Sequence, residues 1–179
     1  MGLMELRSRL AVREDLPALE PLVARAIEEL QRGFLDEEQI AASHAIMGID
    51  TQLVDDRTYY VVEAESGVAG CGGWSRRATP FGGDHSAGRD EHLLDPAVDA
   101  ARVRAMYTHP DFTRRGVGRL ILEGCEQAAA AEGFTRLQLH ATLAGFPLYL
   151  AYGFEPIEEV VLDSGGVGIP AVHMTKAIG

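Results

Sequence analysis

The sequence predicts an α/β protein organised around residues 101–154, where a strand, a glycine-containing loop, a long helix and a second strand follow one another. Residues 101–108 have a strand-like pattern that ends before Pro110, which cannot extend a paired strand. Beyond Gly116, apolar or small residues recur at spacings of three and four, as on one face of a helix. Gly133 suits the left-handed position that follows a helix, so we expect the helix to end there.

The segment before residue 58 predicts a strand and two helices. Residues 5–12 alternate weakly between apolar and polar residues and indicate an opening strand. Asp15 is a suitable cap for a helix with Pro17 in its first turn, which is expected to end before Gly33. Asp36 and Gln39 have the spacing of a capping box for a second helix, and no regular pattern covers the rest of residues 31–56.

Residues 58–75 predict a β-hairpin, because two strand-like runs are joined by a two-residue loop at Ser66-Gly67. Three glycines in its second strand indicate a bulge or a close approach of another backbone; they are Gly70, Gly72 and Gly73. Residues 76–100 then form a long connection rich in Gly and Asp. Such a connection is typical of a functional loop, and we expect a substrate-specific loop or a dimer contact.

The loop at residues 113–119 predicts a site for an anion, most simply a phosphate. The first N–H groups of a helix have no partners within it and lie at the positive end of its dipole. Gly116 and Gly118 let an anion approach the backbone, and Arg114, Arg115 and Arg119 add positive charge. A tight turn with solvated arginines is the alternative. The loop lacks the third glycine of a dinucleotide-binding loop and the Gly-Lys of a Walker loop, which disfavours a nucleotide-binding module.

The C-terminal part predicts a strand, a short helix and a closing hairpin. Residues 135–141 alternate, with Leu137 and Leu139 on one face and Gln138 and His140 on the other. A short helix over residues 145–152 follows, and the last hairpin turns around Ser164-Gly165-Gly166.

Composition limits the classes of partner. The 179 residues, 46% of them hydrophobic, predict one compact domain spanning residues 1–179. A net charge of −11 disfavours nucleic acid and anionic membranes as partners and favours cationic ones such as amines. Cys71 and Cys125 are expected to be buried reduced thiols, and we expect a cytoplasmic location. The sequence shows no apolar run of membrane-spanning length.

Residues 101–154 resemble the acetyl-CoA-binding core of the GNAT superfamily, the Gcn5-related N-acetyltransferases. The loop of that family reads Gln/Arg-x-x-Gly-x-Gly/Ala between a strand and a helix; this chain matches from Arg114 to Gly118 but has Thr113 at the first position. A tyrosine four residues before Gly-Phe, the second signature, stands here as Tyr149 before Gly153-Phe154. The resemblance implies a mixed, mostly antiparallel sheet flanked by helices, whose central strands splay apart to form the acetyl-CoA cleft.

The resemblance also implies functions for individual residues. Tyr149 corresponds to the general acid that protonates the sulfur of coenzyme A, and a phenol can donate this proton at neutral pH. Thr142 stands where many members have Asn, although a helix cap explains it equally well. The main chain at the end of the first core strand is expected to run beside the pantetheine arm. The implied acetyl-CoA site therefore consists of Met106, Tyr107, Thr108, Arg114, Arg115, Gly116, Val117, Gly118, Arg119 and Thr142.

We therefore expect an N-acetyltransferase that moves the acetyl group of acetyl-CoA to a small amine by direct attack in a ternary complex. The alternative is a non-catalytic acyl-CoA-binding sensor or regulatory protein on the same fold, and a homodimer is possible in either case. Phe34, Trp74 and His140 are candidates for the acceptor side, although Trp74 can equally be a core residue. The family often has a Glu on the first core strand and this strand has no acid, so the general base stays open. We expect no metal, because His85 and His92 lack the spacing of a helical zinc pair.

Overall fold

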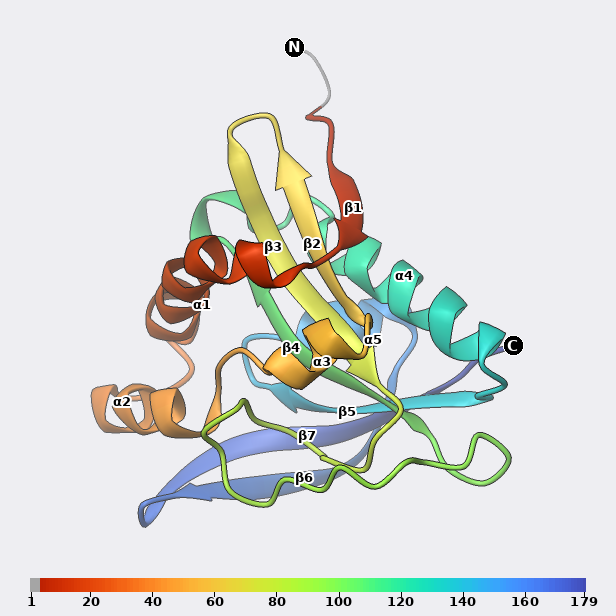
Figure 1. Cartoon of the computed structure of the whole chain (residues 1–179). Coiled ribbons are helices and arrows are strands. Elements are labelled where there is room, and N and C mark those ends of the chain that lie inside the picture. The colour runs from red at the N-terminus through yellow and green to blue at the C-terminus, as the bar shows by residue number, and fades with distance from the viewer. Residues whose placement is uncertain (1–3) are drawn as a thin grey trace.

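The structure is a computed structural model that describes residues 4–179, and within that range seven strands form one sheet (Figure 1). The strands are β1 (Arg7–Leu10), β2 (Tyr59–Ala64), β3 (Gly67–Ser75), β4 (Ala101–Thr108), β5 (Arg136–Thr142), β6 (Glu155–Ser164) and β7 (Val167–Ala177). The α-helices are α1 (Leu16–Leu30), α2 (Glu37–Ile46), α3 (Thr51–Asp55), α4 (Val117–Ala131) and α5 (Phe146–Tyr152). Short 3-10 turns cover Arg13–Asp15 and Pro110–Phe112.

The sheet has the order β1-β2-β3-β4-β5-β7-β6 and is antiparallel at every pair except β4 and β5, which are parallel. These two central strands pair only where they begin, at Ala101 with Leu137 and Arg102 with Gln138. Beyond that point β4 continues with β3 and β5 continues with β7, so the two halves of the sheet separate (Figure 1). The predicted mixed sheet with splayed central strands is confirmed.

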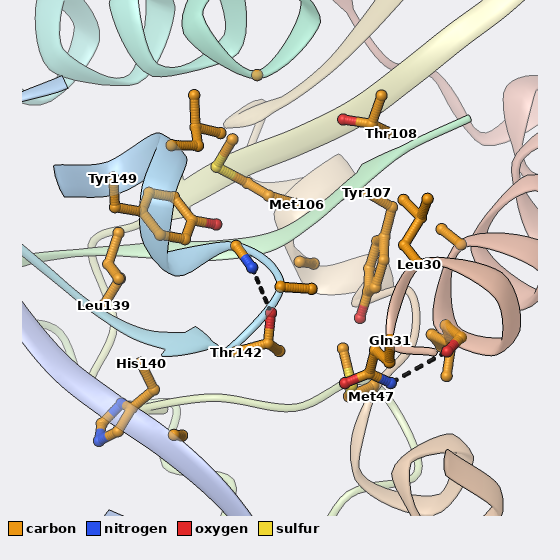
Figure 2. A pocket seen from close by; sticks show the side chains of 18 of the residues that line it. Leu30, Gln31, Met47, Met106, Tyr107, Thr108, Leu139, His140, Thr142 and Tyr149 are labelled. Atoms are coloured by element: carbon orange, nitrogen blue, oxygen red, sulfur yellow. Dashed lines mark hydrogen bonds between the residues drawn. The ribbon is translucent and has the colours of Figure 1, made fainter. Parts of the chain in front are cut away.

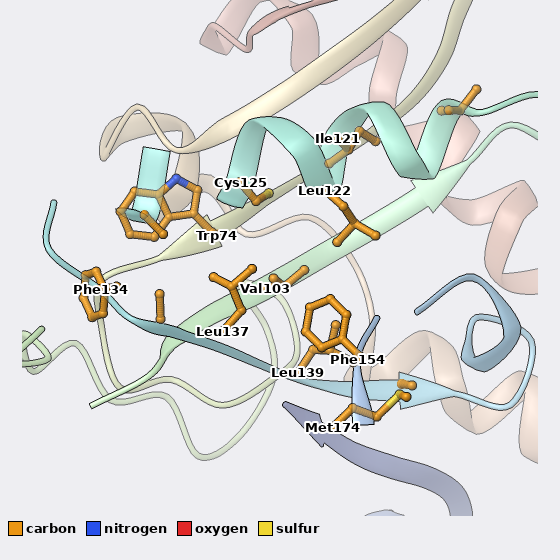
Figure 3. Close-up of a cluster of buried hydrophobic side chains, with 14 of the residues drawn as sticks. Trp74, Val103, Ile121, Leu122, Cys125, Phe134, Leu137, Leu139, Phe154 and Met174 are labelled. Atoms are coloured by element: carbon orange, nitrogen blue, oxygen red, sulfur yellow. The ribbon is translucent and has the colours of Figure 1, made fainter. Parts of the chain in front are cut away.

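Helices cover both faces of the first half of the sheet, because its strands present buried side chains on alternate sides. The face that carries Val62 packs against α4, while the face that carries Val61 packs against α1. Figure 3 shows the α4 side, where Ile121, Leu122 and Cys125 meet the apolar side chains of β4 and β5. On β5 the expected alternation holds, since Leu137 and Leu139 are buried in this cluster.

The N-terminal helices differ in part from the expectation. The capping box of α2 is confirmed, because Asp36 accepts from the Gln39 N–H at 2.8 Å and Gln39 accepts from the Asp36 N–H at 3.0 Å. Asp15 makes no side-chain cap for α1; its carboxylate instead accepts from the Val12 N–H and from Arg9. The short helix α3 was not expected.

The loop between β2 and β3 consists of residues 65–66, one position earlier than expected, because Gly67 pairs with Ala64. The glycines of β3 mark close approaches. A Cβ on Gly72 would meet Met106 of β4, and a Cβ on Gly73 would meet the backbone of β2. Their absence of side chains lets the neighbouring strands pass each other closely.

Residues 76–100 form no helix and no extended strand, but ion pairs hold them to the rest of the protein. Arg77 binds Asp56 at 2.8 Å, and Arg89 binds Asp50 at 3.1 Å. The buried cysteines, Cys71 and Cys125, are unbonded to each other, as expected, and burial raises the pKa of Cys71 to about 12. Among the described residues, no helix has the length and apolar character needed to span a membrane.

Candidate active site

A cavity of about 790 Å³ opens where β4 and β5 separate (Figure 2). Its walls come from α1, residues 46–47, residues 80–82, β4, the loop before α4, β5, α5 and β7. The cavity brings together nearly all of the site residues that the sequence predicted. They are Phe34, Met106, Tyr107, Thr108, Arg114, Gly116, Val117, Gly118, Arg119, His140, Thr142 and Tyr149.

A bulge in β4 shapes the wall of this cavity. Cys71 of β3 pairs with Tyr107 and Gly73 pairs with Arg104, so β4 uses one residue more than β3 over this stretch. Ala105, at a φ of 51°, takes the strained left-handed conformation that the extra residue requires. The bulge bends β4, so that its last residues leave the line of β5. For the glycines of β3 the sequence predicted a bulge or a close approach of another backbone, and both occur, because β3 also uses one residue more than β2 between Val68 and Gly70. The bulge in β4 was not predicted.

The loop before α4 has alternating backbone conformations. Arg114 and Gly116 both have positive φ, at 59° and 88°, on either side of Arg115. Alternating conformations of this kind turn successive backbone N–H groups toward one side. Gly116 is the N-cap of α4 and no side chain caps the helix, so its first N–H groups are free for a ligand. A Cβ on Gly116 would have no protein atom within 4 Å.

The arginines of this loop divide into two groups. Arg114 and Arg119 line the cavity, whereas Arg115 does not, and its guanidinium lies 3.8 Å from the sulfur of Met4. Gly118 also differs from the expectation, because a Cβ there would collide with Leu148 of α5. The glycine at 118 therefore serves the packing of α5 against α4, and Gly116 is the position open to an anion.

Tyr149 lies on α5 with its hydroxyl directed toward Met106 on β4 (Figure 2). Its ring packs edge-on against Phe154 at a centroid distance of 5.9 Å. The hydroxyl has no hydrogen-bond partner among residues 4–179, and burial raises its pKa above the ordinary value. The Tyr149 hydroxyl is therefore a protonated donor that faces a cavity. The hydroxyl of Tyr152, on the same helix, differs because it has a hydrogen-bond partner. The Tyr152 hydroxyl is bonded to Glu126, which also pairs with Lys176 at 3.0 Å, so this tyrosine belongs to a surface network.

Thr142 ends β5 and caps the turn that leads into α5. Its Oγ1 accepts a hydrogen bond from the Gly145 N–H at 3.0 Å. The capping explanation of Thr142 therefore holds, and the residue lines the cavity as well. This bond fixes the start of α5, on which Tyr149 is carried.

The opposite wall of the cavity is largely apolar and comes from α1, residues 46–47 and residues 80–82. Phe34 is 51% exposed and stands at its edge. Tyr107 is buried, its hydroxyl accepts from the Gly48 N–H at 2.8 Å, and burial raises its pKa. Gln31 and Phe81, which the sequence did not single out, are also part of this wall.

His140 lines the cavity and stacks on His173 of β7, with ring centroids 4.9 Å apart and an angle of 9° between the planes. Phe81 meets the same ring edge-on at 5.3 Å. Burial and the neighbouring His173 lower the pKa of His140. The imidazole is therefore neutral near pH 7.

A buried ion pair holds residues 76–100 against β4. Arg104 is 3% exposed and donates to Asp50 at 2.9 Å and to the Gly82 carbonyl at 2.7 Å. Arg89 donates to the same carboxylate at 3.1 Å. The sequence did not predict this cluster; the one signal is the charged Arg102 and Arg104 within an otherwise apolar strand, because a buried arginine needs a partner.

Trp74 is a core residue and does not line the cavity, which corrects its expected place on the acceptor side. It is 1% exposed and packs edge-on against Phe134, with ring centroids 5.9 Å apart. The alternation of β3 turns it to the α4 face of the sheet (Figure 3). In the part of the chain that the structure describes, no group of three or more His, Cys, Asp or Glu side chains could hold a metal ion.

Comparisons with known proteins agree with this fold. The chain is similar to a GCN5-related N-acetyltransferase from Rhodopseudomonas palustris, with a TM-score of 0.74, 18% identity and 99% of each chain covered. It is also similar to the PaiA N-acetyltransferase from Thermoplasma acidophilum in complex with coenzyme A, with a TM-score of 0.66, 16% identity, and coverage of 97% of this chain and 99% of that one. A phosphinothricin acetyltransferase from Sinorhizobium meliloti in complex with acetyl-CoA gives a TM-score of 0.64 at 17% identity, over 99% of this chain and 90% of that one.

These three structural similarities show the fold. The family is shown by a comparison of the sequence with family models. No curated protein sequence matches the chain. A family model described as an acetyltransferase (GNAT) domain matches residues 55–156, which is more than half of the chain and includes the loop before α4 and Tyr149. The chain belongs to the GNAT family of N-acetyltransferases.

Proposed function

We propose that this protein transfers the acetyl group of acetyl-CoA to the primary amine of a small molecule, by direct attack within a ternary complex. The observation that carries the proposal is one continuous cavity that joins the anion-receiving loop before α4 to the unpartnered hydroxyl of Tyr149. A thioester held along the gap between β4 and β5 would have its phosphates at the loop and its sulfur near α5.

The binding of acetyl-CoA would rest on the backbone and on two arginines. The free N–H groups at the start of α4 receive the diphosphate, assisted by Arg114 and Arg119. The main chain of residues 106–108 runs along the pantetheine arm, because β4 is unpaired with β5 after Arg102 and its edge is exposed there. A backbone N–H on this edge would polarise the thioester carbonyl.

In the transfer step, the acetyl group leaves the sulfur of acetyl-CoA and becomes bonded to the nitrogen of the amine. The lone pair of the neutral amine attacks the carbonyl carbon, the C–N bond forms and the C–S bond breaks. The sulfur takes the proton of the Tyr149 hydroxyl, which burial keeps protonated. Among the titratable groups of residues 4–179 that line the cavity, His140 alone is a base that is neutral near pH 7, because its pKa is lowered, so we assign to it the proton that the amine loses, directly or through water.

The cavity walls favour a compact acceptor. The side opposite Tyr149 is lined by α1, by residues 80–82 and by β7. We therefore favour a small amine over an amino group on the surface of a folded protein.

The test is a calorimetric titration of acetyl-CoA beside an assay of thiol release over a panel of primary amines. We expect binding, and thiol release with at least one amine. The paired variants Arg114→Gly and Arg115→Gly each remove one positive charge, and glycine tolerates the positive φ at position 114. We expect Arg114→Gly to raise the Kd by roughly tenfold, the usual effect of losing a charge-assisted hydrogen bond, and Arg115→Gly to leave it nearly unchanged.

Two results would contradict the proposal. Equal losses of affinity in both arginine variants would show that the phosphates bind elsewhere. Tight binding of acetyl-CoA without thiol release for any amine would instead favour an acyl-CoA sensor on this fold.

A further inference from the structure

We infer that the acceptor is a primary amine whose body is apolar and uncharged, and which carries one neutral hydrogen-bond donor that binds the side-chain oxygen of Gln31. This inference rests on the proposed function and names the class of acceptor for that same cavity. Four observations on the wall opposite Tyr149 support it, and each excludes or selects one type of substituent on the amine.

The first observation is the apolar character of the wall. Ile27, Leu30, Phe34, Met47 and Phe81 contribute side chains from three separate segments, and Ile169 of β7 adds another. A surface of this kind stabilises a methylene chain or a ring by removing it from water, by about 25 cal/mol for each Å² buried. It offers little to a polyhydroxylated acceptor, whose hydroxyl groups would lose hydrogen bonds with water.

The second observation excludes an acceptor with a second positive charge. Within residues 4–179, no Asp or Glu side chain lines the cavity, although the chain as a whole has 27 acidic residues. Asp50, the acid bound to the lining residue Arg104, is 1% exposed and is occupied by Arg89 and Arg104. A diamine or polyamine would have to bury its second ammonium group without a counter-ion.

The third observation excludes an acceptor that carries a carboxylate. Arg104 is the one arginine that β4 contributes to this cavity, and its charge is paired with Asp50. Its two Nη atoms donate to Asp50 and to the carbonyls of Gly82 and Thr79, while its Nε is buried and has no partner among the described residues. The other arginines of the lining, Arg114 and Arg119, belong to the loop and the first turn of α4, where we place the diphosphate. A carboxylate at the apolar wall would therefore lose its hydration without gaining a partner.

The fourth observation selects a neutral donor. Gln31 is 4% exposed, and its Nε2 donates to the Ile27 carbonyl at 3.1 Å, which fixes the orientation of the amide. Its Oε1 points away from that bond, beneath Tyr107 and beside Met47 (Figure 2), and has no partner among the described residues. The Tyr107 hydroxyl is committed to Gly48 and cannot supply one. An amide oxygen that lines a ligand cavity without a protein partner favours a ligand hydroxyl or N–H.

The test uses four amines of equal chain length that differ only at the far end, each at butyl and hexyl length. For the hexyl set these are hexylamine, aminohexanol, hexamethylenediamine and aminocaproate, which end in a methyl, a hydroxyl, an ammonium and a carboxylate group. Thiol release gives kcat/KM for each amine, and the shift of the melting temperature in the presence of coenzyme A gives binding without turnover. We expect hexylamine to exceed both charged amines by at least about tenfold. Aminohexanol is expected to exceed hexylamine by roughly fivefold, the effect of one net hydrogen bond.

Two variants make the test specific. Gln31→Leu is expected to abolish the preference for aminohexanol over hexylamine, and a general loss of stability would not change this ratio. Phe34→Glu places a carboxylate at the edge of the wall and should raise the relative kcat/KM of hexamethylenediamine. Ile157→Glu is its matched control, because Ile157 is 54% exposed and lies outside the cavity lining.

The inference is overturned if either charged amine binds as well as hexylamine, if no amine of the set binds, or if Gln31→Leu keeps the preference for the hydroxyl. Selective binding of the neutral amines without thiol release would support the assignment of the pocket and contradict the proposed catalysis. The two conclusions are therefore tested separately.

Discussion

The hydroxyl of Tyr59 donates a hydrogen bond of 2.7 Å to the carbonyl oxygen of Ala105, the residue at the centre of the bulge in β4. Tyr59 is fully buried in the cluster that includes α1, and its side chain reaches from β2 past β3 to hold a strained residue of β4. Because β4 is unpaired with β5 after Arg102, Ala105 lies on the edge of the opening in which we place acetyl-CoA, and the bond helps to fix that edge. The core and the site are therefore connected at Ala105.

Replacement of this hydroxyl should affect both stability and binding. Tyr59→Phe leaves the Ala105 carbonyl without its partner, which should lower the free energy of unfolding by about 1–3 kcal/mol and weaken the binding of acetyl-CoA. Tyr60→Phe is the matched control, because its hydroxyl makes only a long bond of 3.3 Å to the Gly124 carbonyl on the α4 side. Chemical denaturation and calorimetry measure the two effects. Unchanged affinity in a destabilised Tyr59→Phe protein would separate the bulge from the site.

The anion site can be tested at Gly116 with a control on the same helix. Gly116→Ala places a methyl group where the phosphates approach, and Gly133→Ala places one beyond the other end of α4. Both residues have a positive φ, 88° and 97°, so each substitution should cost a similar amount of stability, about 1–2 kcal/mol. We expect the affinity for acetyl-CoA to fall by more than tenfold in Gly116→Ala alone. An equal fall in Gly133→Ala would mean that strain, and not obstruction, reduces binding.

His140 should make the protein less stable in mild acid. Burial first, and His173 second, lower its pKa in the folded state, and Arg102 acts in the same direction. The hydrogen bond with the Pro80 backbone and the charge of Glu158 oppose them. The unfolded chain then binds more protons than the folded one below pH 6.5, so stability rises with pH in that range and is fully present above it. The melting temperature of the protein should therefore fall as the pH decreases below about 6.5.

The variant His140→Gln should reduce this dependence, whereas His92→Gln, a substitution at an exposed histidine outside the cavity, should not. If His140 also takes the proton of the amine, kcat/KM at neutral pH falls in His140→Gln only. Identical pH profiles of stability in the two variants would contradict the assigned effect of burial.

The parts of the fold that depend on local sequence were predictable. The periodicity of residues 117–128, the capping box at Asp36 and Gln39, and the alternation of β5 each depend on neighbours along the chain, and all three are confirmed. The short helix α3 was missed although its signal was present, because Asp50 directly precedes it and accepts from the Gln52 N–H as an N-cap.

The features that depend on distant contacts were not predictable. The bulge at Ala105 results from the register between β3 and β4, and the sequence of β4 shows nothing unusual at that alanine. Gln31 and Phe81 join the cavity because segments distant in the chain meet there, and Trp74 is turned into the core by the same packing. The spacing of Tyr149 before Gly153-Phe154 identified it as the candidate general acid. Only the structure shows that its hydroxyl is directed into the cavity and has no partner among the described residues.

The central claim is that Tyr149 protonates the departing sulfur, and single-turnover thiol release by Tyr149→Phe tests it most directly. The substitution removes one hydroxyl that has no partner among the described residues, so stability and the affinity for acetyl-CoA should change little. Tyr60→Phe is the better control than Tyr152→Phe, because the Tyr152 hydroxyl is bonded to Glu126. If Tyr149 is the general acid, the rate of thiol release falls by roughly 10²–10⁴-fold in Tyr149→Phe, the usual effect of removing a positioned general acid. It stays near normal in Tyr60→Phe. A Tyr149→Phe protein that binds acetyl-CoA and releases thiol at the wild-type rate would contradict this claim.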